Sequence, residues 1–345
     1  MTANLAGKRI ALIGGAGFIG HNLALELKKR GADPHIVDSL QVNNLGAFTN
    51  LDDGSPNKDL YIHLINERLT LVREAGIALH ILDARDYHAL SRCLTAIKPD
   101  VVVQLAAVAH ANRANKDPYS TFDHSLRTLE NALDASRGAV EHFIFMSSSM
   151  VYGNFDDEAV TEEIVCNPIG IYGALKYAGE KMVIAYNQVF GLSYTIVRPS
   201  ALYGERCVSR RVGQAFIENV LRGLPVTING DGSDALDFTY IRDLVDGLIL
   251  CITRPEARNQ VFNVTYGGAR SLNQMAAILR EHFPQLEIKH HPRDQLMPER
   301  GTLSVEKARR LLGYAPAYPL ERGFVGYLDW YKAIAAKNPQ LLRPQ

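Results

Sequence analysis

Residues 9–20 read RIALIGGAGFIG, and this stretch decides the fold. Arg9–Ile13 is a short apolar run that stops at glycines, as a buried parallel strand does. Phe18–Arg30 follows with a helical pattern, in which the last turn is basic and Gly31 ends the helix. A strand, a glycine turn and a helix in this order predict the first unit of a parallel sheet.

The same alternation of strand and helix continues along the chain. Further strands are predicted at His35–Asp38, Ala78–Leu82, Val101–Leu105, Phe143–Met146 and Tyr194–Val197. This rhythm predicts an α/β fold with a doubly wound parallel sheet. Residues 41–75 interrupt it, and we expect an inserted helix there that is either a solvated cover or part of a substrate or subunit contact. Ser200–Gly232, rich in glycine and arginine, is a second interruption.

The composition is that of a globular protein. The chain has 345 residues, 47% of them apolar and 21% charged, which suits one large or two smaller domains. Lys plus Arg equals Asp plus Glu at 37 each, so nothing indicates a nucleic-acid or membrane partner. No apolar run is long enough to span a membrane and no signal peptide is evident, so we expect a cytoplasmic protein. The four cysteines lack metal-binding spacing, and we expect reduced thiols and no metal site.

Glycines 14, 17 and 20 follow the first strand in a GxxGxxG pattern. Gly14 permits a tight turn, Gly17 lets backbone amides approach a pyrophosphate, and Gly20 lets the helix pack closely on the sheet. Asp38 ends the second strand 18 residues after Gly20. A carboxylate there accepts hydrogen bonds from the adenosine ribose and repels a 2′-phosphate, so the pattern predicts NAD rather than NADP. The alternative for Asp38 is a simple capping role.

A second group of polar residues follows the fifth predicted strand. Ser147, Ser148 and Ser149 close that strand, and Tyr172 and Lys176 are spaced four apart, on one face of a helix. A phenol has an ordinary pKa of about 10. The Lys176 ammonium and an oxidised nicotinamide ring would both lower that pKa and favour the phenolate. Behind a glycine loop and a strand-end aspartate, this YxxxK spacing is a strong signal for a tyrosine base.

These motifs resemble, in order, those of the extended short-chain dehydrogenase/reductases, specifically the UDP-glucose 4-epimerase-like group of NAD-dependent nucleotide-sugar epimerases and dehydratases. The matching strings are GGAGFIG (14–20), LDARD (82–86), QLAAVAH (104–110), SSSMVYG (147–153), YGALKYAGE (172–180), VRPSALYG (197–204), DFTYIRDLVDG (237–247) and KARRLLGYAP (307–316). The resemblance implies a Rossmann-type NAD-binding domain, formed by 1–199 plus 237–262. It also implies a smaller C-terminal α/β domain for the nucleotide sugar, formed by 200–236 plus 263–345.

The resemblance also implies roles for individual residues. Tyr172 is the base, Lys176 holds the nicotinamide ribose, and Ser148, four residues before Tyr152, is the hydroxyl partner. The implied cofactor-binding residues, with Asp83 at the adenine, are Gly14, Gly17, Phe18, Ile19, Gly20, Asp38, Asp83, Ala84, Leu105, Ala106, Ala107, Tyr172, Lys176 and Pro199. The implied substrate-binding residues are Ser148, Ser149, Arg206, Arg210, Arg211 and Arg300.

Three departures from the family pattern bear on the reaction. Met150 stands two residues after Ser148, where the family's 4,6-dehydratases and uronic-acid decarboxylases carry an acid, and a thioether cannot eliminate water or protonate an enolate. Leu236 replaces an arginine that grips the diphosphate. The grip is then expected from the four arginines named above, although Arg210 and Arg211 could instead be surface charge. His124 replaces an Asn, as a core or interface histidine or as a substrate contact.

We therefore expect an NAD-dependent nucleotide-sugar epimerase that acts at C4 through a transient 4-keto intermediate. A nucleotide-sugar dehydrogenase or ketoreductase, or a 4,6-dehydratase, is the alternative. A third hypothesis is a non-catalytic NAD-binding regulatory protein. The presence of Ser148, Tyr172 and Lys176 disfavours it, because such a protein needs no base. The family often dimerises through helices that correspond to those near 119–137 and 172–190, so a homodimer is expected.

Overall fold

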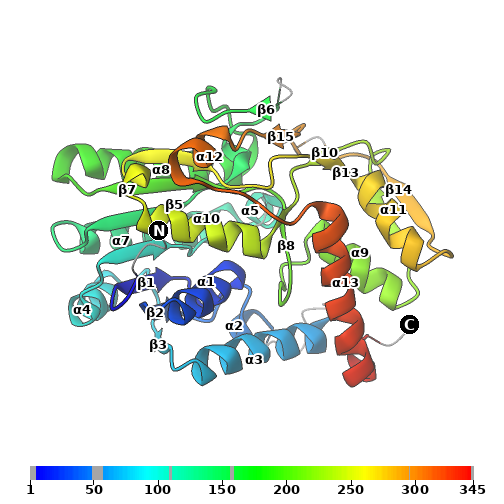
Figure 1. Ribbon diagram of the computed structural model, residues 1–345, viewed down its shortest axis with the longest axis horizontal. Helices are drawn as coiled ribbons and strands as arrows, with labels where there is room; N and C mark the ends of the chain where they lie inside the picture. Colours follow the sequence, from blue (N-terminus) through cyan, green and yellow to red (C-terminus); the bar gives the residue numbers. More distant parts are fainter. Residues whose placement is uncertain (1–4, 49–56, 109–110, 156–158, 295, 343–345) are drawn as a thin grey trace.

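A seven-stranded parallel sheet forms the centre of the computed structural model, which describes residues 5–48, 57–108, 111–155, 159–294 and 296–342. Its strand order is β12-β7-β5-β4-β1-β2-β3 (Figure 1). The strands are β1 (Arg9–Ile13), β2 (Asp33–Asp38), β3 (Ala78–Ile81), β4 (Val101–Gln104), β5 (His142–Met146), β7 (Tyr194–Arg198) and β12 (Gln260–Asn263). The predicted α/β doubly wound sheet is confirmed. The end of the QLAAVAH string, residues 109–110, lies outside the described residues.

Helices cover both faces of this sheet. On one face lie α1 (Phe18–Lys29), α3 (Lys58–Glu74) and α10 (Ile241–Thr253), and on the other α4 (Tyr87–Ile97), α7 (Thr128–Ser136) and α8 (Gly170–Phe190). Shorter helices are α2 (Leu45–Phe48), α5 (Ala111–Lys116) and α6 (Pro118–Phe122). Ile10 and Leu12 of β1 pack into the first layer, whereas Ala11 and Ile13 pack into the second. This alternation within one wholly apolar strand is typical of a sheet buried on both faces.

A smaller group of elements lies to one side of the sheet, at the right of Figure 1. It contains α9 (Val212–Leu221), β9 (Val226–Asn229), β10 (Ala235–Leu236), β13 (Arg270–Ser271), α11 (Leu272–His282), β14 (Ile288–His291) and α13 (Leu320–Lys337). Short connecting elements are β6 (Ala159–Val160), β8 (Leu202–Tyr203), β11 (Thr239–Tyr240), β15 (Thr302–Leu303) and α12 (Glu306–Leu312). β9 pairs with β14 and β10 with β13, outside the large sheet.

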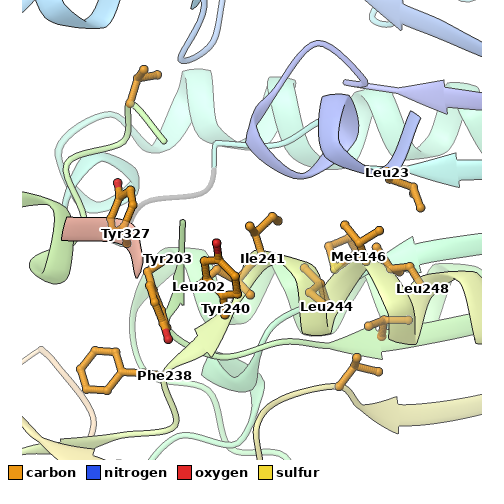
Figure 2. Close-up of a cluster of buried hydrophobic side chains, with 14 of the residues drawn as sticks. Leu23, Met146, Leu202, Tyr203, Phe238, Tyr240, Ile241, Leu244, Leu248 and Tyr327 are labelled. Atoms are coloured by element: carbon orange, nitrogen blue, oxygen red, sulfur yellow. The ribbon is translucent and has the colours of Figure 1, made fainter. Parts of the chain in front are cut away.

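One hydrophobic core joins the two groups of elements. Leu23 of α1 packs in the same cluster as Leu244 and Leu248 of α10, and that cluster continues to Tyr203 and Tyr327 (Figure 2). α10 therefore serves as a wall common to both groups. Because the core is continuous, the orientation of the smaller group against the sheet is set by packing, which gives the space between them a defined shape.

In the part of the chain that the structure describes, no helix is long and apolar enough to cross a membrane. Among these described residues, no cluster of three or more His, Cys, Asp or Glu side chains is placed to bind a metal ion. The four cysteines, Cys93, Cys166, Cys207 and Cys251, are all free thiols.

Asp237 is a fully buried carboxylate at the junction of the two groups. It accepts hydrogen bonds from the backbone N–H of Leu303 at 3.1 Å, from the Thr265 hydroxyl at 3.1 Å and from the N–H of Gly267 at 3.2 Å. Burial raises the pKa of Asp237 to about 6, although these donors oppose the shift. The carboxylate thus holds three separate segments together.

Replacing Asp237 with Ala should destabilise the fold by about 2–4 kcal/mol, because it leaves several buried donors without an acceptor. The folded-state pKa lies above the unfolded value, so the stability that the protonated group contributes is lost as pH rises through about 6. The cost of the substitution should therefore be larger at about pH 5 than at about pH 7, measured by urea unfolding. Asp329→Ala, at an exposed position of α13, is the control, and a cost no greater than the control's would contradict this role.

Candidate active site

Two adjoining cavities open at the carboxyl ends of the parallel strands. The larger cavity has a volume of about 350 Å³ and the smaller cavity about 130 Å³. Ile19, Leu105, Ala107 and Arg211 line both, so the two are neighbours. The strand order reverses between β1 and β4, and in open parallel sheets ligands bind at such a switch point.

The glycine loop, residues 14–20, forms one wall of the smaller cavity. Gly14 has a φ of +80°, and a Cβ atom on it would lie 2.6 Å from the backbone nitrogen of Ala106. A Cβ atom on Gly20 would lie 2.4 Å from the Cα of Gly15. Gly17 caps the N-terminus of α1, which opens on the same cavity. No side chain fits at positions 14 and 20, so the backbone itself can approach a ligand, and the helix dipole favours an anion.

Two carboxylates, Asp38 and Asp83, also line the smaller cavity. Asp38 accepts the N–H of Ala16 at 3.0 Å on one oxygen and the N–H of Leu40 at 2.7 Å on the other, so each oxygen keeps a second acceptor site. Burial raises the pKa of Asp38. Asp83 binds Arg85 at 2.6 Å, and hydrogen bonds from Arg85 lower the pKa of Asp83.

The other expected cofactor residues also reach the two cavities. Phe18, Ile19, Ala84, Leu105, Ala106 and Ala107 line the smaller cavity, and Tyr172, Lys176 and Pro199 line the larger one. His124, which the sequence left open between a packed residue and a substrate contact, lines the smaller cavity. It lies on a π-helical turn, Asp123–Arg127, near enough to Asp83 to lower the pKa of that carboxyl.

Ser148, Tyr172 and Lys176 meet on the larger cavity. Ser148 caps the 3₁₀ turn Ser149–Val151, and its Oγ accepts the N–H of Met150 at 3.2 Å. The same hydroxyl lies close enough to Tyr172 to lower the pKa of its phenol. Tyr172 and Lys176 lie near the start of α8, one turn apart. Met150 lines the same cavity and brings no titratable group to it.

The electrostatics of Tyr172 differ from the expectation. Burial raises the pKa of Tyr172, and the groups that lower it are Arg211, the Ser148 hydroxyl and Arg300. From the sequence we expected Lys176 to lower the pKa of Tyr172. In the structure its Nζ donates to the Met146 carbonyl at 2.6 Å. Burial lowers the pKa of Lys176 itself to about 8. In the protein without ligands, the positive charge that acts on the phenol therefore comes from arginines.

A buried polar network supports this site from behind. Glu180, one turn after Lys176, accepts the Ser147 hydroxyl at 2.5 Å and two hydrogen bonds from Arg198 at 2.9 and 2.7 Å. Arg198 also donates to the Tyr152 hydroxyl at 2.9 Å. The network joins β5, α8 and β7, and because each member is hydrogen-bonded it restricts the rotamers next to Ser148 and Lys176.

Two arginines face the larger cavity with their guanidinium groups buried or half-buried. Arg211 donates from Nε to the Ser209 hydroxyl at 3.3 Å. Nε of Arg300 is buried and has no hydrogen-bond partner among the described residues. Burial and the nearby Arg211 lower the pKa of Arg300 to about 10. An unpaired buried guanidinium N–H is costly, and an anion that accepts it would remove that cost.

The structure does not bring Arg206 and Arg210 to this site. Arg206 pairs with Glu67 at 3.1 Å and donates to His21 at 3.2 Å, and Arg210 is exposed; neither lines either cavity. Both residues have positive φ, +62° and +47°, so the chain turns sharply between them and Arg211. Closeness in sequence could not show which of the three points inward.

Sequence reasoning missed several residues of the site. Arg293 pairs with Asp234 at 3.1 Å, and both line the larger cavity. They stand 59 residues apart, and no motif marks either. Arg68, from the inserted helix α3, lines the smaller cavity. That helix is therefore not only a solvated cover.

Comparison with known proteins agrees with this geometry. The model of the NAD dependent epimerase/dehydratase family matches residues 10–265. A Bacillus subtilis protein described as an uncharacterized UDP-glucose epimerase, YtcB, is 29% identical over 94% of this chain and 98% of its own. The UDP-glucose 4-epimerase of Thermotoga maritima, solved with UDP-glucose, is 26% identical with a TM-score of 0.78. That of Thermus thermophilus, solved with NAD, is 26% identical with a TM-score of 0.79. Both structures cover 94% of this chain and 99% of their own.

Replacing Gly20 with Ala should weaken NAD binding at least about tenfold, because the added methyl group forces the glycine loop away from α1. Gly326→Ala is the matched control: Gly326 also lies within a helix, α13, and a Cβ atom there meets nothing within 4 Å. Calorimetric titration with NAD measures both. Equal affinities for the two variants would show that the close approach at Gly20 does not shape the binding site.

Proposed function

The chain belongs to the NAD-dependent epimerase/dehydratase family, and on that premise we propose that it is a nucleotide-sugar 4-epimerase that works through a transient 4-keto sugar. The observation that carries the proposal is the make-up of the larger cavity. Ser148 and Tyr172 supply a proton-transfer pair there, and Met150 stands where an elimination reaction would need an acid. Epimerisation at C4 needs no further acid or base.

The smaller cavity suits NAD by its geometry. Gly14 and Gly20 leave no room for side chains, and the N-terminus of α1 opens onto the space. We propose that the glycine loop holds the cofactor diphosphate, that Asp38 accepts the adenosine ribose hydroxyls, and that Lys176 holds the nicotinamide ribose. Bound NAD⁺ supplies a hydride acceptor that can return the hydride to the same carbon.

Tyr172 is the proposed base. It takes the proton of the C4 hydroxyl, and the nearby Ser148 hydroxyl, which lowers the pKa of Tyr172, hydrogen-bonds the same sugar oxygen during the transfer. Tyr172 then holds the proton while the 4-keto sugar turns over in the cavity, and gives it back to the C4 oxygen on reduction. The network behind Ser147 keeps the donor and acceptor atoms in place during both transfers.

Arg211 and Arg300 are the proposed anchors for the sugar-nucleotide diphosphate. Both line the larger cavity, and the unpartnered Nε of Arg300 is the strongest single sign of an anion site. Leu236 lines the same cavity and presents an apolar surface to it. We therefore propose that Arg211 and Arg300 make the diphosphate contact that an arginine at position 236 would otherwise make.

We also propose a domain division and an oligomeric state. The large domain would consist of 1–199 plus 237–262 and the substrate domain of the rest, since β12 lies in the large sheet and α10 packs on α1. A homodimer would form through α6, α7 and α8. Tyr119, 85% exposed on α6, and Val189, 70% exposed on α8, are apolar side chains available on that surface.

Tyr172→Phe should lower turnover at least about a hundredfold, because positioned general acid–base catalysis typically contributes 10²–10⁴-fold. NAD affinity should stay within about threefold of wild type, because the phenol oxygen is lost but the ring remains. Tyr186→Phe, on the same helix outside both cavities, is the control. Activity of Tyr172→Phe within about tenfold of wild type would refute the assigned base.

The reaction itself can be read by proton NMR of the protein with NAD⁺ and UDP-, GDP-, CDP- and dTDP-sugars in deuterated water. A new isomer without deuterium, and without accumulated NADH, is expected for C4 epimerisation. Accumulated NADH would indicate a dehydrogenase. Deuterium at C3 or C5, or loss of the C6 hydroxyl, would indicate enolisation or dehydration and contradict the part assigned to Met150.

A further inference from the structure

Arg68 is a buried arginine that the proposed reaction does not use. It lies on α3, the helix of the 41–75 insertion, and is 1% exposed. Leu60, Leu64 and Val72 share its buried face at four-residue spacing, so Arg68 interrupts an apolar stripe. Arg68 also lines the smaller cavity. Burying such a group is costly unless its N–H groups are satisfied.

The guanidinium donates hydrogen bonds to two backbone carbonyls. Nε donates to the carbonyl of Arg206 at 2.8 Å, and Nη2 donates to the same oxygen. Nη1 donates to the carbonyl of Asn43 at 3.4 Å. Arg206 and Asn43 both have positive φ, +62° and +49°, a conformation that costs free energy for residues other than glycine. The contacts therefore hold two strained turns in place.

The two turns belong to loops that build different parts of the site. Residues 39–44 form the first loop, which lines the smaller cavity through Ser39, Val42 and Asn43. Residues 204–211 form the second, which ends in Arg211, a residue that lines both cavities. Glu67, next to Arg68 on α3, binds the Arg206 side chain at 3.1 Å, so α3 grips the second loop twice.

The role of Arg68 is one of shape as much as of charge. Among the described residues, no carboxylate lies within 4.0 Å of its guanidinium; Asp38 is near enough to raise the pKa of Arg68, whereas the basic Arg206 lowers it. Burial lowers the pKa of Arg68 to about 10. A planar fork can serve two carbonyls in different directions, whereas a lysine ammonium of the same charge presents a single point.

We propose that Arg68 is a positioning residue: it fastens loop 39–44 to loop 204–211 and thereby places Arg211 between the two cavities. The inference rests on the proposed function in so far as Arg211 is taken to bind the diphosphate of the sugar nucleotide. In this proposal, the inserted helix α3 couples the cofactor side of the site to the substrate side.

A double-mutant cycle tests whether Arg68 acts through Arg211. UDP is titrated calorimetrically into the NAD-loaded protein, comparing wild type with Arg68→Met, Arg211→Met and the double variant. Each single variant should bind UDP about tenfold more weakly, and the double variant no more than about twofold more weakly than Arg211→Met alone. Losses that multiply to about a hundredfold would overturn the proposal. Arg73→Met, at the exposed end of α3, is the control.

Amide hydrogen exchange gives a readout that does not depend on any substrate. In Arg68→Met, and in Arg68→Lys as the variant that keeps the charge, exchange in residues 204–211 should be faster by about tenfold or more, while the glycine loop stays as in wild type. Unchanged exchange in 204–211 would overturn the proposal. If wild type binds no UDP, the nucleotide assignment fails, and the exchange result still decides the role of Arg68.

Discussion

The rest of the site depends on how closely β1 and β4 approach at their carboxyl ends. The N–H groups of Leu105 and Ala106 both donate to the Ile13 carbonyl, at 2.8 and 2.9 Å, which brings the chain after β4 against Gly14. A side chain at position 14 would collide with that backbone. The contact fixes where the strand order reverses, and with it the walls of both cavities, since Leu105 lines each of them. The glycine pattern is thus a packing requirement of the sheet first and a ligand-binding feature second.

Buried charges divide between those that build the site and those left free to act in it. Glu180 and Arg198 neutralise each other, and their hydrogen bonds reach Ser147 and Tyr152, so this pair maintains geometry and has no charge to offer a ligand. Removing one partner of such a pair strands the other in a low-dielectric interior, which makes the network rigid as a unit. Arg300 is the opposite case, because its buried Nε lacks a partner among the described residues. A buried charged residue whose hydrogen bonds are all made within the protein supports the fold, whereas one with an unpartnered N–H can bind a ligand. The presence of partners, more than the depth of burial, distinguishes the two.

Sequence reasoning identified the parts of the molecule that are local. The first strand was predicted with its observed bounds, and the glycine loop, Asp38 and the spacing of Tyr172 and Lys176 could be read because each lies within one strand–turn–helix unit. Contacts that depend on turns between distant segments could not be predicted from the sequence. Arg206 and Arg210 lie at turns with positive φ and line neither cavity, and no pattern in the sequence marks such turns in residues other than glycine. Arg68 did leave a signal, since a charged residue in the middle of the stripe formed by Leu60, Leu64 and Val72 indicates a buried, partnered cation. What it binds could come only from the fold.

The position of the arginines ties anion binding to the strength of the base. Arg211 and Arg300 both lower the pKa of Tyr172 in the protein without ligands, opposing the effect of burial. If the same two groups bind a diphosphate as proposed, that anion offsets their charge, and the phenol then responds more fully to burial. Its pKa rises, which makes the phenolate a stronger base and a less abundant one. The phenol would then stay protonated unless another positive charge favours the phenolate, and the oxidised nicotinamide ring of bound NAD⁺ would supply that charge, while the nearby Ser148 hydroxyl also lowers the pKa of Tyr172. Proton transfer is then coupled to occupancy of the whole cavity and not to the sugar alone.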